Sequence, residues 1–236
     1  MRALKAAVKE AFRAVGLDVS IISNQPPTAL LHHHIDLLFD VGANTGQYAL
    51  QSRKGGYKGR IISFEPLPDA HATLLAKSKK DTLWTIHERC AIGSAPGVAE
   101  INISKNSYSS SLRKMLSSHS SAAPESLYIG KAKTNVIALD SVFESYSKPN
   151  DRVFLKIDTQ GFETEVLNGV CGHLRNVCVV QLELSVIPLY ENQDLYRYYL
   201  DFFEKNGFVL WSLVPGFFHP GTGQLLQFDA VFVNKN

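Results

Sequence analysis

Residues 37–66 constrain the fold of this chain more than any other stretch. They read LLFDVGANTGQYALQSRKGGYKGRIISFEP. An apolar run ends in Asp40, a turn with Gly42 and Gly46 leads into an amphipathic segment, and a second apolar run ends in Glu65. This order predicts a strand, a glycine loop, a helix and a second strand that ends in an acid.

The glycine loop predicts a ligand at the N-terminus of the following helix. Gly42 and Gly46 lack a Cβ, so a ligand could lie against backbone whose N–H groups are unpaired. The sequence G-A-N-T-G lacks the middle glycine of the dinucleotide pattern, and Asp40 would repel a pyrophosphate. Asp40 instead suits an ammonium or sulfonium charge, while Glu65 is placed to accept hydrogen bonds from a ribose diol. A ligand with these properties and no phosphate is S-adenosylmethionine.

Three strings carry a resemblance to a known family. They are F-D-V-G-A-N-T-G-Q-Y, S-F-E-P, and L-K-I-D-T-Q-G-F-E-x-E-V-L-N-G. Together they resemble the FkbM-type family of S-adenosylmethionine-dependent methyltransferases, from about residue 35 to the C-terminus. The resemblance implies a Rossmann-like class I methyltransferase fold of the α/β class. Such a fold has a mostly parallel seven-stranded sheet, helices on both faces and an antiparallel C-terminal hairpin.

The resemblance also implies an activity. The expected reaction is O-methylation of a hydroxyl on a sugar, a glycolipid or polysaccharide, or a natural product, so the expected partner is a small-molecule or glycan acceptor. A net charge of +2 provides no broad field for nucleic acid, which is not an expected partner. Two alternatives stay open. One is a cofactor-binding module without catalysis, and the other is an NAD-dependent oxidoreductase, which the missing middle glycine weakens.

The chain divides into an N-terminal helical extension, residues 1–34, and a methyltransferase domain, residues 35–236. Within the extension, residues 1–15 place apolar side chains on one stripe, as in an amphipathic helix. This helix is expected to pack on the domain, and peripheral membrane contact or a role as a substrate lid are the alternatives. The run His32 to His34 is not expected to bind a metal, because adjacent residues of a helix point in different directions.

Cysteine content and apolar run lengths predict a cytoplasmic protein. Cys90, Cys171 and Cys178 form no C-x-x-C pair and are expected to be buried free thiols, which fits a reducing compartment. No stretch approaches the roughly 20 apolar residues that span a bilayer. Nothing in the sequence indicates an oligomeric state.

Further strands complete the expected sheet. One apolar run, residues 153–157, leads to Asp158. A second, residues 176–184, has Glu183 near its end. Ligands of open α/β sheets bind beyond the carboxyl ends of the strands, so these acids should join Asp40 and Glu65 at one edge. Residues 104–134 are rich in Ser and Lys without a clear period, and are expected to form a long loop that is a lid or disordered.

The expected cofactor site contains residues of the glycine loop, of the strand ends and of the turn at Ala91 and Ile92, where small side chains would suit an adenine ring. The full set of expected cofactor-binding residues is Asp40, Gly42, Ala43, Asn44, Gly46, Glu65, Pro66, Ala91, Ile92 and Asp158. By the same resemblance, a serine element at residues 109–111 is expected to approach the cofactor or the substrate.

Four residues are candidates for catalysis. Methyl transfer to a hydroxyl needs a base, and Asp158 is the first choice because its strand should lie next to the cofactor strand. Lys156 alternates with Asp158 and should face the same side, where it could orient an acceptor oxygen. Glu183 is the second acid, and His219, on the loop between the last strands, is another candidate base. Asp158 and Glu183 could instead hold Mg²⁺, which is the less favoured alternative, and no metal site is predicted.

Overall fold

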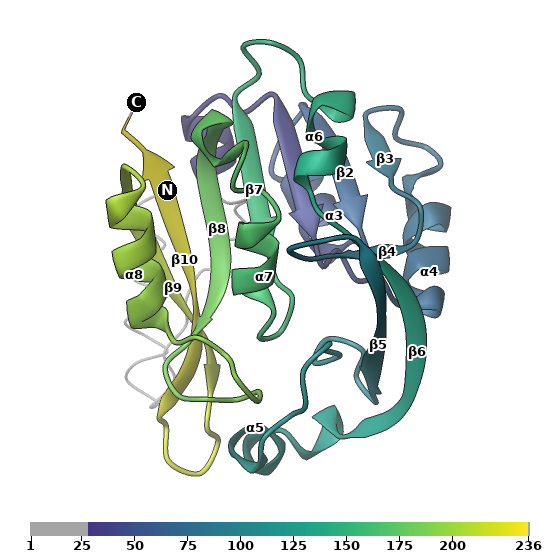
Figure 1. Ribbon diagram of the computed structural model, residues 1–236, viewed down its shortest axis with the longest axis vertical. Helices are drawn as coiled ribbons and strands as arrows, with labels where there is room; N and C mark the ends of the chain where they lie inside the picture. Colours follow the sequence, from purple (N-terminus) through teal and green to yellow (C-terminus); the bar gives the residue numbers. More distant parts are fainter. Residues whose placement is uncertain (1–27, 236) are drawn as a thin grey trace, which may run out of the picture.

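The structure, a computed structural model, describes residues 28–235, so the helix expected over residues 1–15 lies outside the described residues. The described part contains a seven-stranded sheet in the order β3-β2-β1-β7-β8-β10-β9 and a three-stranded sheet in the order β4-β6-β5 (Figure 1). The larger sheet is made of β1 (Leu37–Val41), β2 (Arg60–Phe64), β3 (Trp84–Ile86), β7 (Val153–Ile157), β8 (Val177–Ser185), β9 (Phe208–Phe218) and β10 (Leu225–Asn234). The smaller sheet is made of β4 (Cys90–Ile92), β5 (Gly97–Ser104) and β6 (Tyr128–Ile137).

The helices connect these strands. They are α2 (Thr28–His32), α3 (Gln47–Lys54), α4 (Pro68–Ser78), α5 (Ser117–Ala122), α6 (Asp140–Tyr146), α7 (Glu163–Asn168) and α8 (Tyr196–Lys205), with 3-10 turns η1 (Pro124–Ser126) and η2 (Leu174–Asn176). Within residues 28–235, no helix is both long and apolar enough to cross a bilayer.

Strand directions confirm the predicted sheet. The strands β3, β2, β1, β7 and β8 run parallel to their neighbours, whereas β10 is antiparallel to both β8 and β9. The C-terminal hairpin therefore adds two strands to one edge, and its second strand, β10, lies inside the first, β9. Because the five parallel strands all end at the same edge, the residues that follow them meet there.

Helices cover both faces of the larger sheet, as predicted (Figure 1). On β1, the side chains of Leu37, Phe39 and Val41 enter a core shared with α6, α7 and α8. Leu38 points to the other face, into a core shared with α2, α3 and α4. This alternation follows from the two-residue period of a strand, and it places Asp40 on the same face as Leu38.

The expectation of a long loop over residues 104–134 is wrong in part. This segment contains α5, η1 and the first residues of β6, and β6 pairs antiparallel with β5 and parallel with β4. Most side chains of β6 are exposed or only partly buried, with Thr134 as the buried exception. The more buried face of β6 carries small or polar residues such as Ala132 and Thr134, so the sequence shows no clear apolar alternation over most of this strand.

The cysteines differ in their environment. All three are free thiols, with Cys90 buried, Cys178 partly buried and Cys171 exposed. The expectation that all of them are buried is therefore wrong for Cys171, which lies in the turn between α7 and η2.

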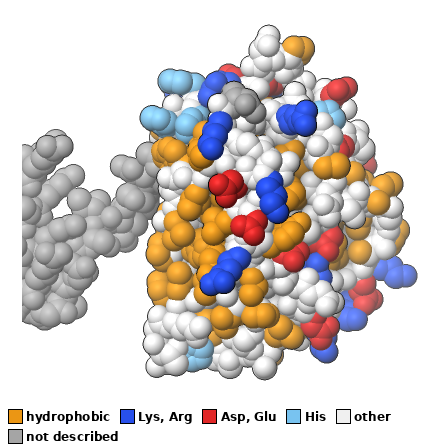
Figure 2. All heavy atoms as spheres, turned by 60° about the vertical axis from the view of Figure 1, so that its left-hand side comes forward, with side chains coloured by type: hydrophobic (Ala, Val, Ile, Leu, Met, Phe, Trp, Pro, Cys, Tyr) orange, Lys and Arg blue, Asp and Glu red, His pale blue; other side chains and the backbone are white. Residues whose placement is uncertain are grey.

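Strand β9 presents apolar side chains to solvent. Figure 2 shows hydrophobic side chains gathered on the side of the molecule that carries α8 and the hairpin. Six of the exposed large hydrophobic residues lie on β9, namely Val209, Leu210, Trp211, Leu213, Val214 and Phe218. Within the described residues β9 is the last strand of its sheet, so its outer edge has no strand neighbour.

The glycine loop is held by contacts of the chain with itself. Gly42 has a φ of +76°, and a Cβ there would lie 1.9 Å from the carbonyl oxygen of Asp158. Gly46 has a φ of +84°, and its Cβ would lie 2.6 Å from the Trp84 ring. The position that a Cβ would occupy is thus filled by the backbone of Asp158 at Gly42 and by the Trp84 ring at Gly46, so both glycines serve the packing of the chain itself.

Replacing Gly42 with alanine should therefore destabilise the fold. The left-handed backbone and the collision with Asp158 together predict a loss of about 3 kcal/mol in the free energy of unfolding. Urea unfolding measures this loss. Gly97→Ala is the matched control, since nothing lies within 4 Å of its Cβ position. Losses within about 0.5 kcal/mol of each other for the two variants would contradict the packing argument.

Candidate functional site

A cleft lies at the carboxyl ends of β1, β2, β7 and β8. Its empty space, counted out to open solvent, is about 830 Å³. The predicted site residues that line the cleft are Gly42, Asn44, Glu65, Pro66, Ala91, Ile92, Asp158 and Glu183. Residues that are distant in the sequence are thus brought to one cavity.

Glu65 closes one side of this cleft. Its Oε2 accepts a hydrogen bond from the backbone N–H of Asn44 at 2.7 Å, and its Oε1 accepts one from Leu67 at 2.8 Å. The side chain is only 3% exposed, and burial raises its pKa to about 7, although the two backbone hydrogen bonds oppose the shift. Glu65 therefore titrates near neutral pH at the wall of the cleft.

Asp40 lies beneath the cleft and does not line it. It is fully buried, and its Oδ1 is 3.3 Å from Nζ of Lys156, its neighbour across the β1–β7 pairing. Ser63 donates a hydrogen bond to the other oxygen at 3.4 Å. The structure thus places a lysine of the chain, and not a ligand, beside Asp40. This corrects the expectation of a direct contact with a charged ligand.

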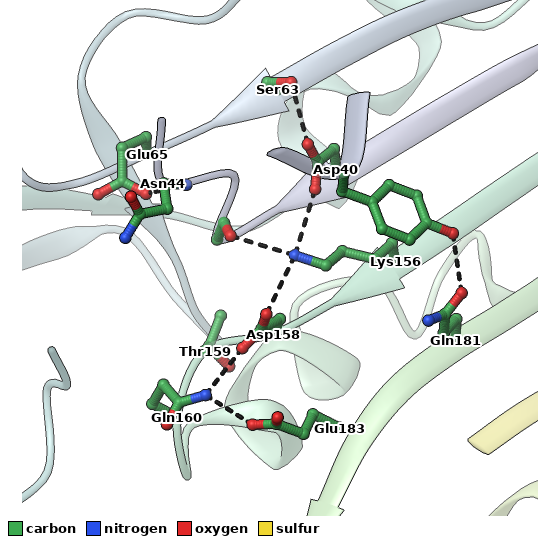
Figure 3. Close-up of polar contacts among 12 residues, drawn as sticks. Asp40, Asn44, Ser63, Glu65, Lys156, Asp158, Thr159, Gln160, Gln181 and Glu183 are labelled. Atoms are coloured by element: carbon green, nitrogen blue, oxygen red, sulfur yellow. Dashed lines mark hydrogen bonds and ion pairs between the residues drawn. The ribbon is translucent and has the colours of Figure 1, made fainter. Parts of the chain in front are cut away.

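Lys156 joins Asp40 to the cleft, as Figure 3 shows. Its Nζ donates to the carbonyl oxygen of Gly42 at 3.1 Å and lies 3.4 Å from Oδ2 of Asp158. Burial alone would lower the pKa of Lys156, but the carboxylates of Asp158 and Asp40 outweigh burial and raise the pKa. Lys156 is therefore a fixed positive charge under the cleft, and it does not line the cleft itself.

Asp158 and Glu183 share one amide donor. Nε2 of Gln160 donates to Oδ1 of Asp158 at 2.9 Å and to Oε2 of Glu183 at 2.6 Å (Figure 3). Gln227 donates a further hydrogen bond to Glu183 at 2.8 Å. Burial raises the pKa of Glu183 well above its usual value, and the nearby carboxylate of Asp158 raises it further. Glu163, the first residue of α7, accepts the N–H groups of Thr159 and Gly161 in the turn before the helix.

Three predicted residues lie away from the cleft. Ala43 is buried in the core on the α3 side, and Gly46 packs against Trp84. His219 sits at the tip of the C-terminal hairpin, where its Nδ1 accepts the N–H of Gly221 at 3.1 Å. The structure does not bring His219 to the cleft, so the expectation of His219 as a base is corrected by this placement.

The sequence reasoning missed several residues of the cleft. Gln160, Phe162 and Tyr108 line it, and the first two belong to the KIDTQGFE string, which was the available signal. The residues of the serine element make different contacts. Ser110 lines the cleft, whereas Ser111 donates to the carbonyl oxygen of Gln160 at 2.6 Å.

Possible metal ligands do not cluster. Within residues 28–235, no group of three or more His, Cys, Asp or Glu side chains is arranged to hold a metal ion. The histidine run contributes instead to ring contacts, with His32 and His33 at 5.9 and 5.6 Å from the Trp211 ring.

The family described as "Methyltransferase FkbM domain" matches residues 40–210. The chain belongs to this family. The description of this family is that of a methyltransferase domain, which agrees with a cleft at the strand ends. The match spans the glycine loop, Glu65, Asp158 and Glu183, so the residues that build the cleft all lie inside the FkbM domain.

One relative of this FkbM protein is the hexuronic acid methyltransferase AglP of Haloferax volcanii. It is 28% identical over 155 residues, which cover 65% of this chain. The match spans only 58% of the length of that relative.

Solved structures of methyltransferases are also similar to this chain. A Klebsiella pneumoniae protein proposed to be an O-methyltransferase matches with a TM-score of 0.52 and 12% identity, over 97% of this chain and 89% of its own. A precorrin-6y C5,15-methyltransferase from Geobacter metallireducens has a TM-score of 0.45 and 16% identity, over 86% and 81% of the two chains. The first likeness supports the class I methyltransferase fold.

The buried contact between Asp40 and Lys156 predicts a large effect of removing one partner. Lys156→Met should lower the free energy of unfolding by about 3–5 kcal/mol at pH 7, because Asp40 stays buried without a counter-charge. The loss should shrink at pH 5. Without Lys156 the pKa of Asp40 lies further above its unfolded value, so the native state keeps the proton and its stability is lost as pH rises.

The double variant Asp40→Asn with Lys156→Met is the matched control, since it leaves no buried charge at this position. It should recover part of the stability in urea unfolding. Equal losses in the single and double variants, at both pH values, would contradict the role given to this pair.

Proposed function

We propose that this protein methylates a hydroxyl on a sugar unit of a small molecule, glycolipid, polysaccharide or natural product, with S-adenosylmethionine as donor. The observation that carries the proposal is the single cleft that joins Glu65 to the Asp158–Gln160–Glu183 contacts. Membership of the FkbM family supports the reaction class. The hexuronic acid methyltransferase relative supports a sugar as acceptor.

The residues of the cleft fit the adenosyl part of the donor. Each carboxylate oxygen of Glu65 accepts one backbone N–H, and a carboxylate oxygen can accept a second donor, here a ribose hydroxyl. Ala91, Ile92 and Phe162 supply small and flat apolar surface for the adenine ring. Asn44 holds Glu65 in place through its backbone N–H, so the glycine loop positions the ribose contact indirectly.

The acids at the other end of the cleft would accept the proton of the acceptor hydroxyl. When bound, the cofactor supplies an electrophilic methyl group on a sulfonium sulfur. Asp158 would take the proton of the acceptor hydroxyl as that hydroxyl is methylated. Lys156 holds Asp158 through a charge contact at 3.4 Å, and Gln160 orients Asp158 and Glu183 together.

Two measurements test the proposed function. Calorimetry should show binding of S-adenosylmethionine and not of NAD. Incubation with methyl-labelled S-adenosylmethionine and a panel of methyl glycosides should give labelled sugar with the label on oxygen. Binding of NAD alone would instead support an oxidoreductase, and binding of neither ligand would overturn the assignment of the cleft.

The raised pKa of Glu65 predicts that the affinity of the cleft for a ribose depends on pH. Hydroxyl groups donate to the ionised carboxylate, and the pKa of Glu65 is about 7, so adenosine affinity should rise about tenfold between pH 6 and pH 8. Adenosine is the probe because it has no group of its own that titrates in this range. Calorimetry on Glu65→Gln should show weak binding at both pH values; an equally steep rise in this variant would contradict the assignment.

Asp158→Asn should remove most of the turnover while the protein still binds the cofactor. Loss of a base predicts a decrease of about 100-fold or more in kcat with a labelled methyl donor. The affinity for S-adenosylmethionine should change by less than about threefold, or about 0.7 kcal/mol. Glu100→Gln, in an exposed ion pair on the smaller sheet, is the control that should keep full activity. Unchanged turnover in Asp158→Asn would leave Glu183 as the base.

A further inference from the structure

A second cavity adjoins the cleft beyond Gln160. It lies between the α5–η1 segment and the C-terminal hairpin, which Figure 1 shows near each other below the strand ends. Its empty space is about 500 Å³, and Tyr108, Gln160 and Glu183 line both this cavity and the cleft. A molecule in the second cavity would therefore meet the cleft beside Gln160, which donates a hydrogen bond to Asp158.

His119 is a buried wall of the second cavity. Its side chain, on α5, is 3% exposed, and its ring packs against the rings of Tyr190 at 5.2 Å and Phe217 at 5.4 Å. No described residue forms a hydrogen bond with its buried Nδ1. A buried polar atom without a partner is costly, so a hydrogen-bonding group of a molecule in the adjoining cavity would stabilise His119 if it reached this nitrogen.

The protonation state of His119 fits hydrogen bonding to an uncharged group. Burial lowers the pKa of His119 to about 4, although Glu125 opposes the shift. The imidazole is therefore neutral at pH 7, with one nitrogen as donor and the other as acceptor. A hydroxyl can satisfy either nitrogen, because it both donates and accepts.

The remaining polar lining consists of hydroxyls, amides and acids. Ser126 receives hydrogen bonds from Ser109 at 3.0 Å and from Asn106 at 2.9 Å. Glu125 and Glu183 contribute carboxyl groups, and among residues 28–235 no lysine or arginine lines either cavity. A ligand with its own carboxylate would find no cation in this lining, and the carboxylate of Glu125 would repel it.

We propose that the second cavity is the acceptor subsite, that it takes a neutral, hydroxyl-rich sugar unit, and that His119 binds one hydroxyl of that unit. This inference rests on the proposed function and narrows its substrate class. The acceptor hydroxyl that reacts then lies at the junction of the two cavities, next to Gln160 and Glu183.

Matched pairs of methyl hexosides and methyl hexuronosides test the substrate class. Each pair differs only in a hydroxymethyl group against a carboxylate. In protein with labelled histidines, a neutral glycoside should shift the imidazole signals of His119 but not of the exposed His32, and should bind at least tenfold more tightly than its acidic partner. Equal or tighter binding of the hexuronosides would overturn the proposal, as would no response of His119 to any pair.

The same titration is run with and without S-adenosylmethionine. Failure of the cofactor to bind would overturn the proposed function, while the glycoside response of His119 is read independently of it. The two failures are thus distinguishable.

The variant His119→Phe tests the hydrogen bond. Phenylalanine keeps the ring contacts and removes the unpaired nitrogen, so the urea midpoint should be unchanged or higher. The KM for a responding glycoside should rise about tenfold while the affinity for S-adenosylmethionine stays the same. The control His32→Gln should leave both constants unchanged. An unchanged KM in a folded His119→Phe protein would overturn the role of His119.

Discussion

One buried positive charge organises the functional end of this fold. Lys156 lies between Asp40 on β1 and Asp158 after β7, and it also binds the carbonyl oxygen of Gly42. Buried ions are costly unless they are paired and hydrogen-bonded in good geometry. The register of β1 against β7 places Asp40 opposite Lys156, so strand pairing and charge pairing specify the same arrangement. The glycine loop is held at its start by this contact.

Gln160 extends that arrangement outward from the sheet. Its backbone is in the left-handed region, with a φ of +55°, and its amide reaches both Asp158 and Glu183. Its Oε1 accepts a hydrogen bond from Tyr190 at 2.8 Å. Because Tyr190 also packs against His119, one side chain connects the floor of the cleft to the wall of the second cavity.

The features that could be predicted from the sequence are the strands and the acids that follow them. Apolar runs that end in Glu65 and Asp158 sufficed to predict parallel strands with acids at one edge. Sequence alone does not reveal that Asp40 meets Lys156, because their contact depends on which strands become neighbours. Most of strand β6 was missed because its more buried face carries small or polar residues and gives no clear apolar period.

His219 and His119 show that the sequence also could not identify every residue of the site. His219 stood beside aromatic residues in a loop and was chosen, whereas His119 lay in the polar run SSHSS and was not. Only the tertiary packing of α5 against Tyr190 and Phe217 makes His119 the buried one. A lone histidine has no sequence period, so its burial cannot be predicted from its neighbours in the chain.

The outer edge of β9 bears on how molecules of this protein meet one another. An unpaired apolar edge is a template for sheet extension between molecules. Pro215 lies within β9 and has no N–H to donate. The pairing of β9 with β10 is also irregular, both between Pro215 and the hairpin turn and between Val231 and Phe232. A proline and an irregular, bulged strand both work against regular pairing with another molecule, despite the exposed apolar side chains.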